Sequence, residues 1–149
     1  MRILFATHNQ HKLREIQEIL SNFPGSIICA KDLGMTEEVE ENGTSFLENA
    51  EIKARALYNF AKAQGLLEED DLVMADDSGL CVPALGGAPG VRSARFALDA
   101  ITDPAEREAL QAGGRARLDT ENIRHLLARC QDVSAPVRAY FYSVVVWVA

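Results

Sequence analysis

The sequence contains no pair of cysteines in the C-x-x-C spacing that zinc sites use. Its three cysteines, Cys29, Cys81 and Cys130, are an odd number and lie far apart along the chain. A structural zinc site is therefore not expected. Free thiols persist in a reducing compartment, so this cysteine usage predicts a cytoplasmic protein.

Long apolar runs and an excess of basic residues are also absent. No stretch reaches the roughly 18 apolar residues that a membrane-spanning helix requires, and the N-terminal segment MRILFATHNQ turns polar too early for a signal peptide. The formal net charge is -7, so no positive surface is expected to attract a nucleic acid polymer or an anionic membrane. An acidic protein can still bind a polyanion locally through a divalent cation.

What the sequence does contain is an alternation of apolar strands and amphipathic helices. Residues 3–6 and 72–75 are short apolar runs typical of buried strands, and residues 26–30 fit a further strand. Apolar residues at helical spacing mark residues 12–20 and 119–129 as helices. This alternation predicts an α/β fold, and 149 residues suffice for one domain with its own core.

Some segments carry more specific signals. Ser45 and Glu48 form an S-x-x-E capping box at the start of the clearest helix, which Gly65 is expected to end. In the helix of residues 119–129 we expect the apolar residues to lie inside, namely Ile123, Leu126 and Leu127. The chain ends within the β-branched and aromatic run YFYSVVVWVA, which needs neighbouring strands. We therefore expect the natural chain to continue beyond residue 149.

The loop between the first strand and the first helix, THNQHK at residues 7–12, is the first candidate site. In α/β sheets, ligands gather at the carboxyl ends of strands, and a helix N-terminus there offers N–H groups that suit phosphate. Thr7 and Asn9 add hydrogen-bonding groups, and Lys12 adds a positive charge. The competing interpretation is an ordinary turn with a surface lysine, since the glycines of a Walker A loop are absent.

An acidic loop before the helix that starts near Ser45 is the second candidate. Mg²⁺ prefers oxygen ligands and usually keeps waters and substrate phosphates in its shell, so Glu41 or Glu48 could supply one ligand. Asn49 and Lys53 are four residues apart and share a helix face. For Glu48 alone, capping the helix is the stronger interpretation.

Two adjacent acids, Asp76 and Asp77, directly follow the buried strand of residues 72–75. Successive strand residues point to opposite faces, so the two acids are expected to have different roles. One could hold a metal or activate water, and the other could pair with a helix N-terminus or a lysine. The competing interpretation is an Asx-type turn, which the sequence Asp-Ser-Gly favours.

The glycine-rich segment GGAPGVRSARFA contains Arg92 and Arg95, and arginine binds phosphate as a bidentate fork. Taken alone, the segment is better interpreted as a flexible surface loop with solvated arginines. None of the three histidines has the spacing of a metal-binding pair. We expect His8 and His11 in a loop and His125 on a helix surface.

Together, three segments resemble, in order and spacing, the signature segments of the inosine triphosphate pyrophosphatase family, whose members act on non-standard purine nucleoside triphosphates. The segments are ATHNQHKLREI, EENGTSFLENAEIKARA and ADDSGLCVPALGGAPGVRSARFA, and NIRHLL and RAYFYSVVVWV resemble those that follow. The resemblance covers essentially the whole chain. It implies that residues 1–149 form a single nucleoside triphosphate pyrophosphatase domain whose C-terminal part is missing.

The resemblance also implies an elongated, two-lobed α/β architecture with a mixed central sheet flanked by helices, and a homodimer. The implied reaction is the Mg²⁺-dependent hydrolysis of inosine, deoxyinosine and xanthosine triphosphates to the monophosphate and pyrophosphate.

Site roles follow from the resemblance by position. The residues expected to bind substrate are Thr7, His8, Asn9, Gln10, His11, Lys12, Lys53, Ser78 and Arg95. Asp77 would be the general base and a metal ligand, and Glu41 the other metal carboxylate, with Glu48 as second choice. The resemblance leaves Asp76 with a supporting or structural role.

The sequence departs from the family in one respect. The family continues into a Gly-Phe-Gly-Tyr-Asp-Pro segment and a later Ser-His-Arg segment, which help to bind the base and the phosphates, and neither is present. One alternative is therefore a catalytically impaired fragment that binds nucleotide or dimerises without turnover. Another is a pyrophosphatase of the septum-inhibition type, which acts on modified pyrimidine triphosphates, but its loops differ from TSFLENAEIKA.

Overall fold

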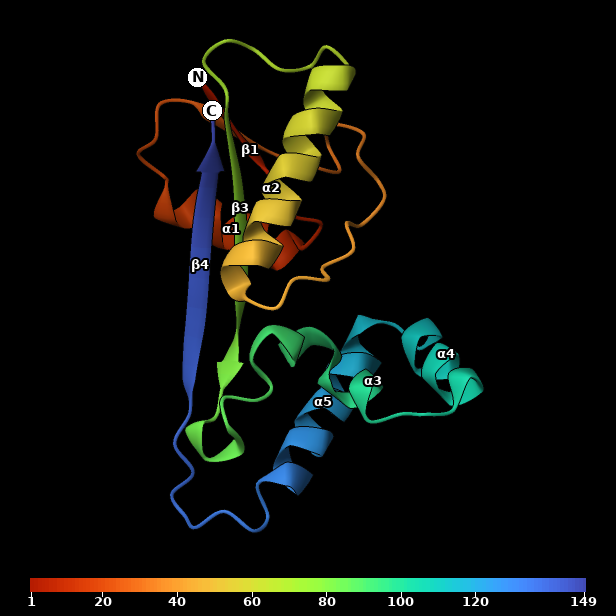
Figure 1. The fold of residues 1–149 in the computed structure, drawn as a ribbon. Helices are drawn as coiled ribbons and strands as arrows, with labels where there is room; N and C mark the ends of the chain where they lie inside the picture. The colour runs from red at the N-terminus through yellow and green to blue at the C-terminus, as the bar shows by residue number, and fades with distance from the viewer. The chain divides into compact units, whose positions relative to one another are not determined.

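The computed structural model describes residues 1–149 as a mixed four-stranded sheet with five α-helices (Figure 1). The strands are β1 (Arg2–Phe5), β2 (Ser26–Cys29), β3 (Leu72–Cys81) and β4 (Tyr140–Val148). The helices are α1 (Gln10–Ile19), α2 (Phe46–Ala63), α3 (Phe96–Asp99), α4 (Pro104–Ala112) and α5 (Arg115–Arg129), with short 3-10 helices at Pro83–Leu85 and Gly90–Arg95. The predicted α/β class with a mixed sheet is confirmed.

The strands lie in the order β2-β1-β3-β4. β1 pairs in parallel with both of its neighbours, and Phe5 lies opposite Cys29 in β2 and Met74 in β3. The arrow of β4 runs against that of β3 in Figure 1, which makes the sheet mixed. The carboxyl ends of the three parallel strands therefore meet at one edge of the sheet, where ligands gather in α/β folds.

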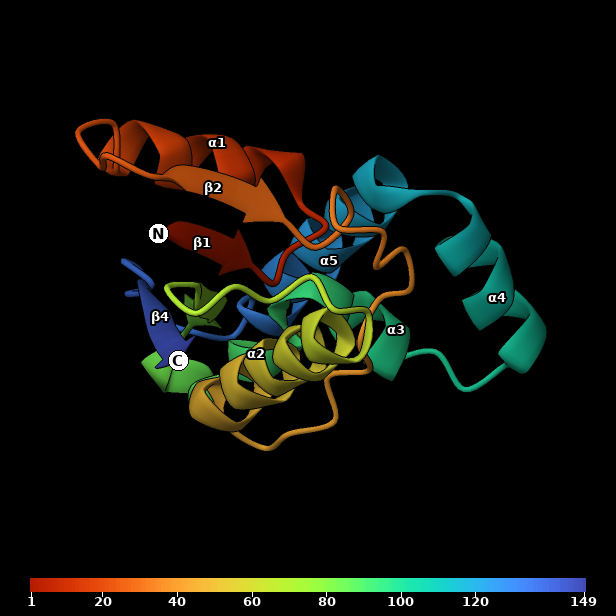
Figure 2. The ribbon, with the colours of Figure 1, turned by 90° about the horizontal axis from the view of Figure 1, so that it is seen from above.

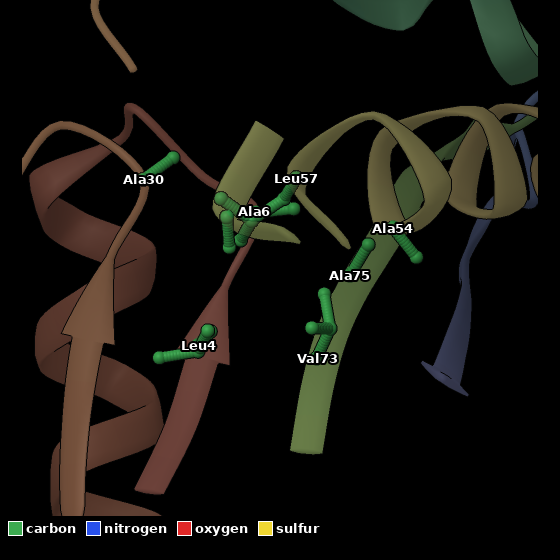
Figure 3. Close-up of a cluster of buried hydrophobic side chains, with 8 residues drawn as sticks. Leu4, Ala6, Ala30, Ala54, Leu57, Val73 and Ala75 are labelled. Carbon is green, nitrogen blue, oxygen red and sulfur yellow. The ribbon is translucent and has the colours of Figure 1, made fainter. Parts of the chain in front are cut away.

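The two faces of the sheet are covered by different helices, with α1 on one face and α2 on the other (Figure 2). Alternation along each strand decides which side chain faces which helix. On the α2 face the apolar residues form one cluster, drawn in Figure 3: Leu4, Ala6, Ala30, Ala54, Leu57, Ala61, Val73 and Ala75. On the α1 face the cluster consists of Ile3, Phe5, Leu13, Cys29 and Met74.

The chain divides into two compact units. The first comprises residues 1–77 and 143–149, and the second comprises residues 78–142. The second unit has a small core of Ala97, Leu98 and Leu110. In this unit Asn122 of α5 is buried, and its side chain accepts a hydrogen bond from Ala97 N at 2.8 Å.

The inward face predicted for α5 is partly wrong. Ile123 and Leu127 are exposed, whereas the polar Asn122 is buried. The cause is that α5 packs on α3 and on the 3-10 helix before it, where backbone groups need a partner. The side-chain amide of Asn122 supplies one, since it also donates to Ala94 O at 3.0 Å.

None of the helices combines the length and the apolar character that a membrane span requires. The three cysteines are free thiols, and two of them, Cys29 and Cys81, are buried.

Candidate functional site

The loop after β1 is held in place by its own side chains. Thr7 is buried, and its Oγ1 accepts a hydrogen bond from Asn9 N at 3.1 Å. Asn9 is the N-cap of α1, and its Oδ1 accepts from His11 N at 2.9 Å and from Lys12 N at 3.5 Å. An anion at this helix start would therefore compete with the Asn9 cap for these N–H groups.

The two histidines of this segment point to different partners. His8 Nε2 lies 2.8 Å from Met35 O, so the ring is hydrogen-bonded to backbone. His11 is exposed and lies in the first turn of α1, next to Arg14, rather than in the loop as predicted. Gln10, the first residue of α1, is also exposed. Within this segment, the side chain of Lys12 contacts another predicted site residue, Asp76.

β3 continues through both aspartates and ends at Cys81. The turn interpretation of Asp-Ser-Gly is therefore wrong for this chain. The physical reason is that β3 has a hydrogen-bonded neighbour, β4, on its other side. Pairing between strands satisfies the backbone groups that an Asx turn would otherwise satisfy locally.

Because the strand continues, Asp76 and Asp77 point to opposite faces of the sheet, as predicted. Asp76 faces α1, where its Oδ2 accepts a hydrogen bond from Lys12 Nζ at 2.5 Å. Both partners are largely shielded from solvent, with 28% of the Lys12 side chain and 13% of the Asp76 side chain exposed. Each of the adjacent acids therefore has its own environment.

Asp77 faces α2 and is buried. Its Oδ1 lies 3.7 Å from Lys53 Nζ, which also lies 3.3 Å from Oε2 of Glu41. Burial raises the pKa of the Asp77 carboxyl above its ordinary value, while the positive charge of Lys53 acts in the opposite direction. A carboxylate with a raised pKa, next to a lysine and a second carboxylate, is a suitable acceptor for a proton.

Asn49 is a residue of this cluster that the sequence did not assign to the site. It lies one turn before Lys53 on α2, is almost completely buried, and its side chain lowers the pKa of Asp77. Its Oδ1 also accepts a hydrogen bond from Gly43 N at 2.8 Å. A Cβ at Gly43 would lie only 2.6 Å from that Oδ1, so the close approach of the acidic loop to α2 requires glycine. The spacing of four residues from Lys53 was the signal for Asn49.

Glu48 belongs to the helix cap. Ser45 accepts a hydrogen bond from Glu48 N at 3.1 Å, and Glu48 Oε2 accepts from Thr44 N at 2.6 Å and Thr44 Oγ1 at 2.8 Å. Hydrogen bonds from Thr44 lower the pKa of the exposed Glu48 carboxyl. The predicted capping box is present, and the glutamate also bonds to the backbone and hydroxyl of Thr44.

The predicted metal carboxylates do not form one cluster. No group of three or more His, Cys, Asp or Glu side chains is arranged to hold a metal ion by itself. Glu41 and Asp77 both approach the ammonium group of Lys53, whereas Glu48 is bonded to Thr44.

The remaining predicted residues belong to the second unit, residues 78–142. Ser78 follows Asp77 within β3 and is half-buried. Arg95 ends a 3-10 helix, so part of the segment predicted as a loop is helical. Arg92 forms a bidentate ion pair with Asp99, with Nε donating to Oδ2 at 2.7 Å. Because its guanidinium donates to Asp99, Arg92 is less suited to bind a phosphate.

The charges of the first unit's cluster can be read from these contacts. Lys12 and Lys53 each bind a carboxylate at the end of the parallel strands, and the carboxylates involved are Asp76, Asp77 and Glu41. With all groups ionised, the cluster is negative by one charge. A bare polyanion is therefore disfavoured here, and a polyanion that carries a divalent cation is accommodated.

Comparison with known proteins identifies relatives of this chain. The chain is 44% identical over 110 residues to a dITP/XTP pyrophosphatase of Campylobacter jejuni. This alignment covers 74% of this chain and 52% of that protein. It is 37% identical over 146 residues to a dITP/XTP pyrophosphatase of Caldanaerobacter subterraneus, covering 97% of this chain and 62% of that protein. The chain thus spans between half and two thirds of the length of these relatives.

Solved structures share the fold. A HAM1 protein from Coxiella burnetii matches with a TM-score of 0.70 and 33% identity, covering 99% of this chain and 62% of that one. A nucleoside-triphosphatase, dITP/XTP pyrophosphatase, from Mycobacterium abscessus matches with a TM-score of 0.63 and 34% identity, covering 99% of this chain and 71% of that one. Since residues 3–149 also match the profile of the Ham1 family, the chain belongs to the Ham1 family.

Proposed function

We propose that this protein hydrolyses non-standard purine nucleoside triphosphates, such as inosine, deoxyinosine and xanthosine triphosphates, to the monophosphate and pyrophosphate. The observation that carries the proposal is the buried Asp77 at the carboxyl-end edge of the sheet, next to Lys53 and Glu41. The names of the relatives, dITP/XTP pyrophosphatases, supply the substrate class.

In this proposal Asp77 accepts the proton of the attacking water. The water oxygen bonds to the α-phosphorus as the bond from that phosphorus to the α–β bridging oxygen breaks, and pyrophosphate leaves. Lys53 meets the phosphate oxygens that become more negative, while Lys12, on the other side of β3, binds the triphosphate equally before and during the reaction. Lys53 lies close to Asp77, which supports this division of labour. Such electrostatic stabilisation and proton transfer are the main requirements for cleaving a phosphoric anhydride.

The remaining predicted contacts are part of the same proposal. Residues 7–12 bind the triphosphate, Ser78 and Arg95 contact the substrate, and His8 and Asn9 shape the loop through the bonds described above. Gln10 and His11 are exposed at the start of α1, where a phosphate could reach them.

We further propose Mg²⁺ as the cofactor. Mg²⁺ is usually held by one or two carboxylates together with substrate phosphates, and the chain offers two converging carboxylates, Glu41 and Asp77. Their chemistry therefore fits a cation that arrives with the triphosphate. When bound, the ion would neutralise phosphate charge. The bonds of Glu48 to Thr44 favour Glu41 over Glu48 as the second ligand.

A cytoplasmic location and a homodimer complete the proposal. The free cysteines support a reducing compartment. Exposed apolar side chains on β4, among them Phe141, Val145 and Trp147, support association with a second copy.

The test is pyrophosphate release from inosine, xanthosine and deoxyinosine triphosphates, with adenosine and guanosine triphosphates as comparison, in Mg²⁺ and in excess chelator. We expect release from the non-standard purines, dependent on the metal. Triphosphate binding without release would instead support a protein that binds nucleotide without turnover. Faster release from a modified pyrimidine triphosphate would contradict the proposed substrate class.

A further inference from the structure

We propose that Asp76 is a positioning residue that presents Lys12 to the substrate's phosphates. This inference rests on the proposed function and adds a role for the acid whose task the sequence left open. Asp76 itself is not expected to touch the reacting atoms.

The first step is geometric. Asp76 and Asp77 are neighbours in β3, yet the strand turns them to opposite faces, where Asp76 meets Lys12 of α1 and Asp77 meets Lys53 of α2. Two helices on opposite faces of the sheet thus each bring one lysine to the end of the parallel strands. Because Asp76 and Asp77 are adjacent, the two lysines reach neighbouring positions of β3 from opposite sides.

The second step concerns the freedom of Lys12. A lysine side chain has four rotatable bonds, and an unrestrained one would sample many rotamers. Lys12 Nζ is instead fixed by a hydrogen bond of 2.5 Å to Asp76 Oδ2, on a carboxylate that is itself shielded and carried by a strand. An ammonium that is fixed before binding loses less entropy when a phosphate arrives.

The third step shows why Asp76 is not expected to contact the reacting atoms. It faces α1, whereas Glu41, Lys53 and Asp77 gather on the α2 face. The lysine ammonium has three donors, so Lys12 can keep its bond to Asp76 and still donate to a phosphate oxygen. The pair therefore acts as a unit, with Lys12 making the contact and Asp76 holding it.

The experiment is a double-mutant cycle on KM and kcat with Mg²⁺–inosine triphosphate, using Asp76→Asn, Lys12→Met and the double variant. Asp76→Asn keeps the shape of the side chain and removes the charge that holds Lys12. We expect KM to rise about tenfold, within the range known for coupled neighbours in one network, while kcat changes less than about threefold. In the Lys12→Met background the Asp76 substitution should raise KM no further.

Three controls separate this role from a structural one. Asp71→Asn breaks another ion pair of the same unit, between Asp71 and Arg2, and is expected to lower stability with KM unchanged. Asp76→Glu keeps the negative charge and should retain part of the affinity. This variant still tests the proposal if Asp76→Asn does not fold. Binding of inosine, which has no phosphates, should be equal in wild type and Asp76→Asn.

The outcomes are distinct. An unchanged KM in Asp76→Asn, or KM effects that multiply independently in the double variant, would overturn the positioning role while leaving the proposed function intact. If the wild type releases no pyrophosphate, the same cycle is measured on the binding of Mg²⁺–inorganic triphosphate by calorimetry. Absence of triphosphate binding in the wild type would refute the proposed function and, with it, this inference.

Discussion

The burial of the Asp77 carboxyl has a consequence for stability. Because burial raises its pKa in the folded state, the group favours folding below its ordinary pKa of about 4, and this contribution is lost as the pH rises through the folded-state pKa. Above the folded-state pKa the buried charge therefore opposes folding. A neutral side chain of the same shape would remove that cost.

We therefore expect Asp77→Asn to lose turnover but not stability. Loss of a general base lowers kcat by about 100-fold or more, while the unfolding temperature at pH 7 should equal or exceed that of the wild type, since Lys53 retains Glu41 as a partner. Pyrophosphate release and thermal unfolding followed by circular dichroism check both parts. Turnover close to the wild-type rate would exclude Asp77 as the base.

Asp71 shows the opposite behaviour. Arg2 donates to it from Nε at 2.9 Å and from a terminal nitrogen at 2.5 Å, and this hydrogen bonding lowers the pKa of Asp71. A depressed pKa stabilises the fold above the ordinary value of about 4, and the stabilisation is lost as the pH falls through the folded-state pKa.

Asp71→Asn is thus expected to cost about 2 kcal/mol of unfolding free energy at pH 7, with the difference from wild type shrinking as the pH falls below about 4. Urea denaturation over this pH range measures it. The neighbouring Asp70, which is exposed, provides the matched control, because Asp70→Asn should change stability by less than about 0.5 kcal/mol. A difference that stays constant with pH would contradict the linkage.

One feature that was predictable at this scale is the opposite orientation of the two adjacent acids. Two adjacent acids after a buried strand had to face different ways, and the structure gives each its own lysine. Their individual partners could not be predicted from local sequence, because they depend on which helix covers which face of the sheet. The burial of Asn49 against Asp77 depends on the same packing, so its spacing from Lys53 was a signal only in retrospect.

At the scale of elements, the start of α2 combines a helix cap with a part of the candidate site. Glu48 completes the cap through Thr44, and Glu41 precedes it in the loop and approaches Lys53. Two glutamates in one acidic segment therefore have separable roles.

Isosteric substitutions distinguish these roles. We expect Glu41→Gln to raise the Mg²⁺ concentration for half-maximal activity about tenfold, in line with the effect of weakening a metal site, because one of two carboxylates near Lys53 is neutralised. Glu48→Gln should leave this concentration unchanged and lower only the unfolding temperature. A metal dependence that shifts in Glu48→Gln and not in Glu41→Gln would assign the ligand to Glu48.

Helices and strands were predictable where the local sequence pattern and the packing in the folded protein favour the same structure. The cap at Ser45 and the strand at residues 72–75 are such cases. β3 runs past the predicted turn because a neighbouring strand pairs with it, and α5 buries Asn122 rather than Ile123 because loop backbone groups need its amide. Both differences arise from partners distant in sequence, which periodicity cannot reveal.

At the scale of the whole molecule, the question is what covers β4. It is an edge strand in the order β2-β1-β3-β4, and Val145 and Trp147, two residues apart on the same face, are about half exposed. An edge strand with exposed apolar side chains is a surface on which another chain, or a further segment of the same chain, can pair or pack. The proposed homodimer would use it.

Val145→Glu is therefore expected to shift the dimer towards monomer, with association at least about tenfold weaker because a charge would be buried in the contact. Sedimentation equilibrium measures the shift, and Trp147, the single tryptophan, should show a blue-shifted emission as the wild-type protein is concentrated. Ile19→Glu changes an equally apolar and even more exposed residue on α1, so it should leave association unchanged. A monomeric wild type at all concentrations would refute the homodimer, whereas a Val145→Glu variant that still dimerises would move the interface away from β4.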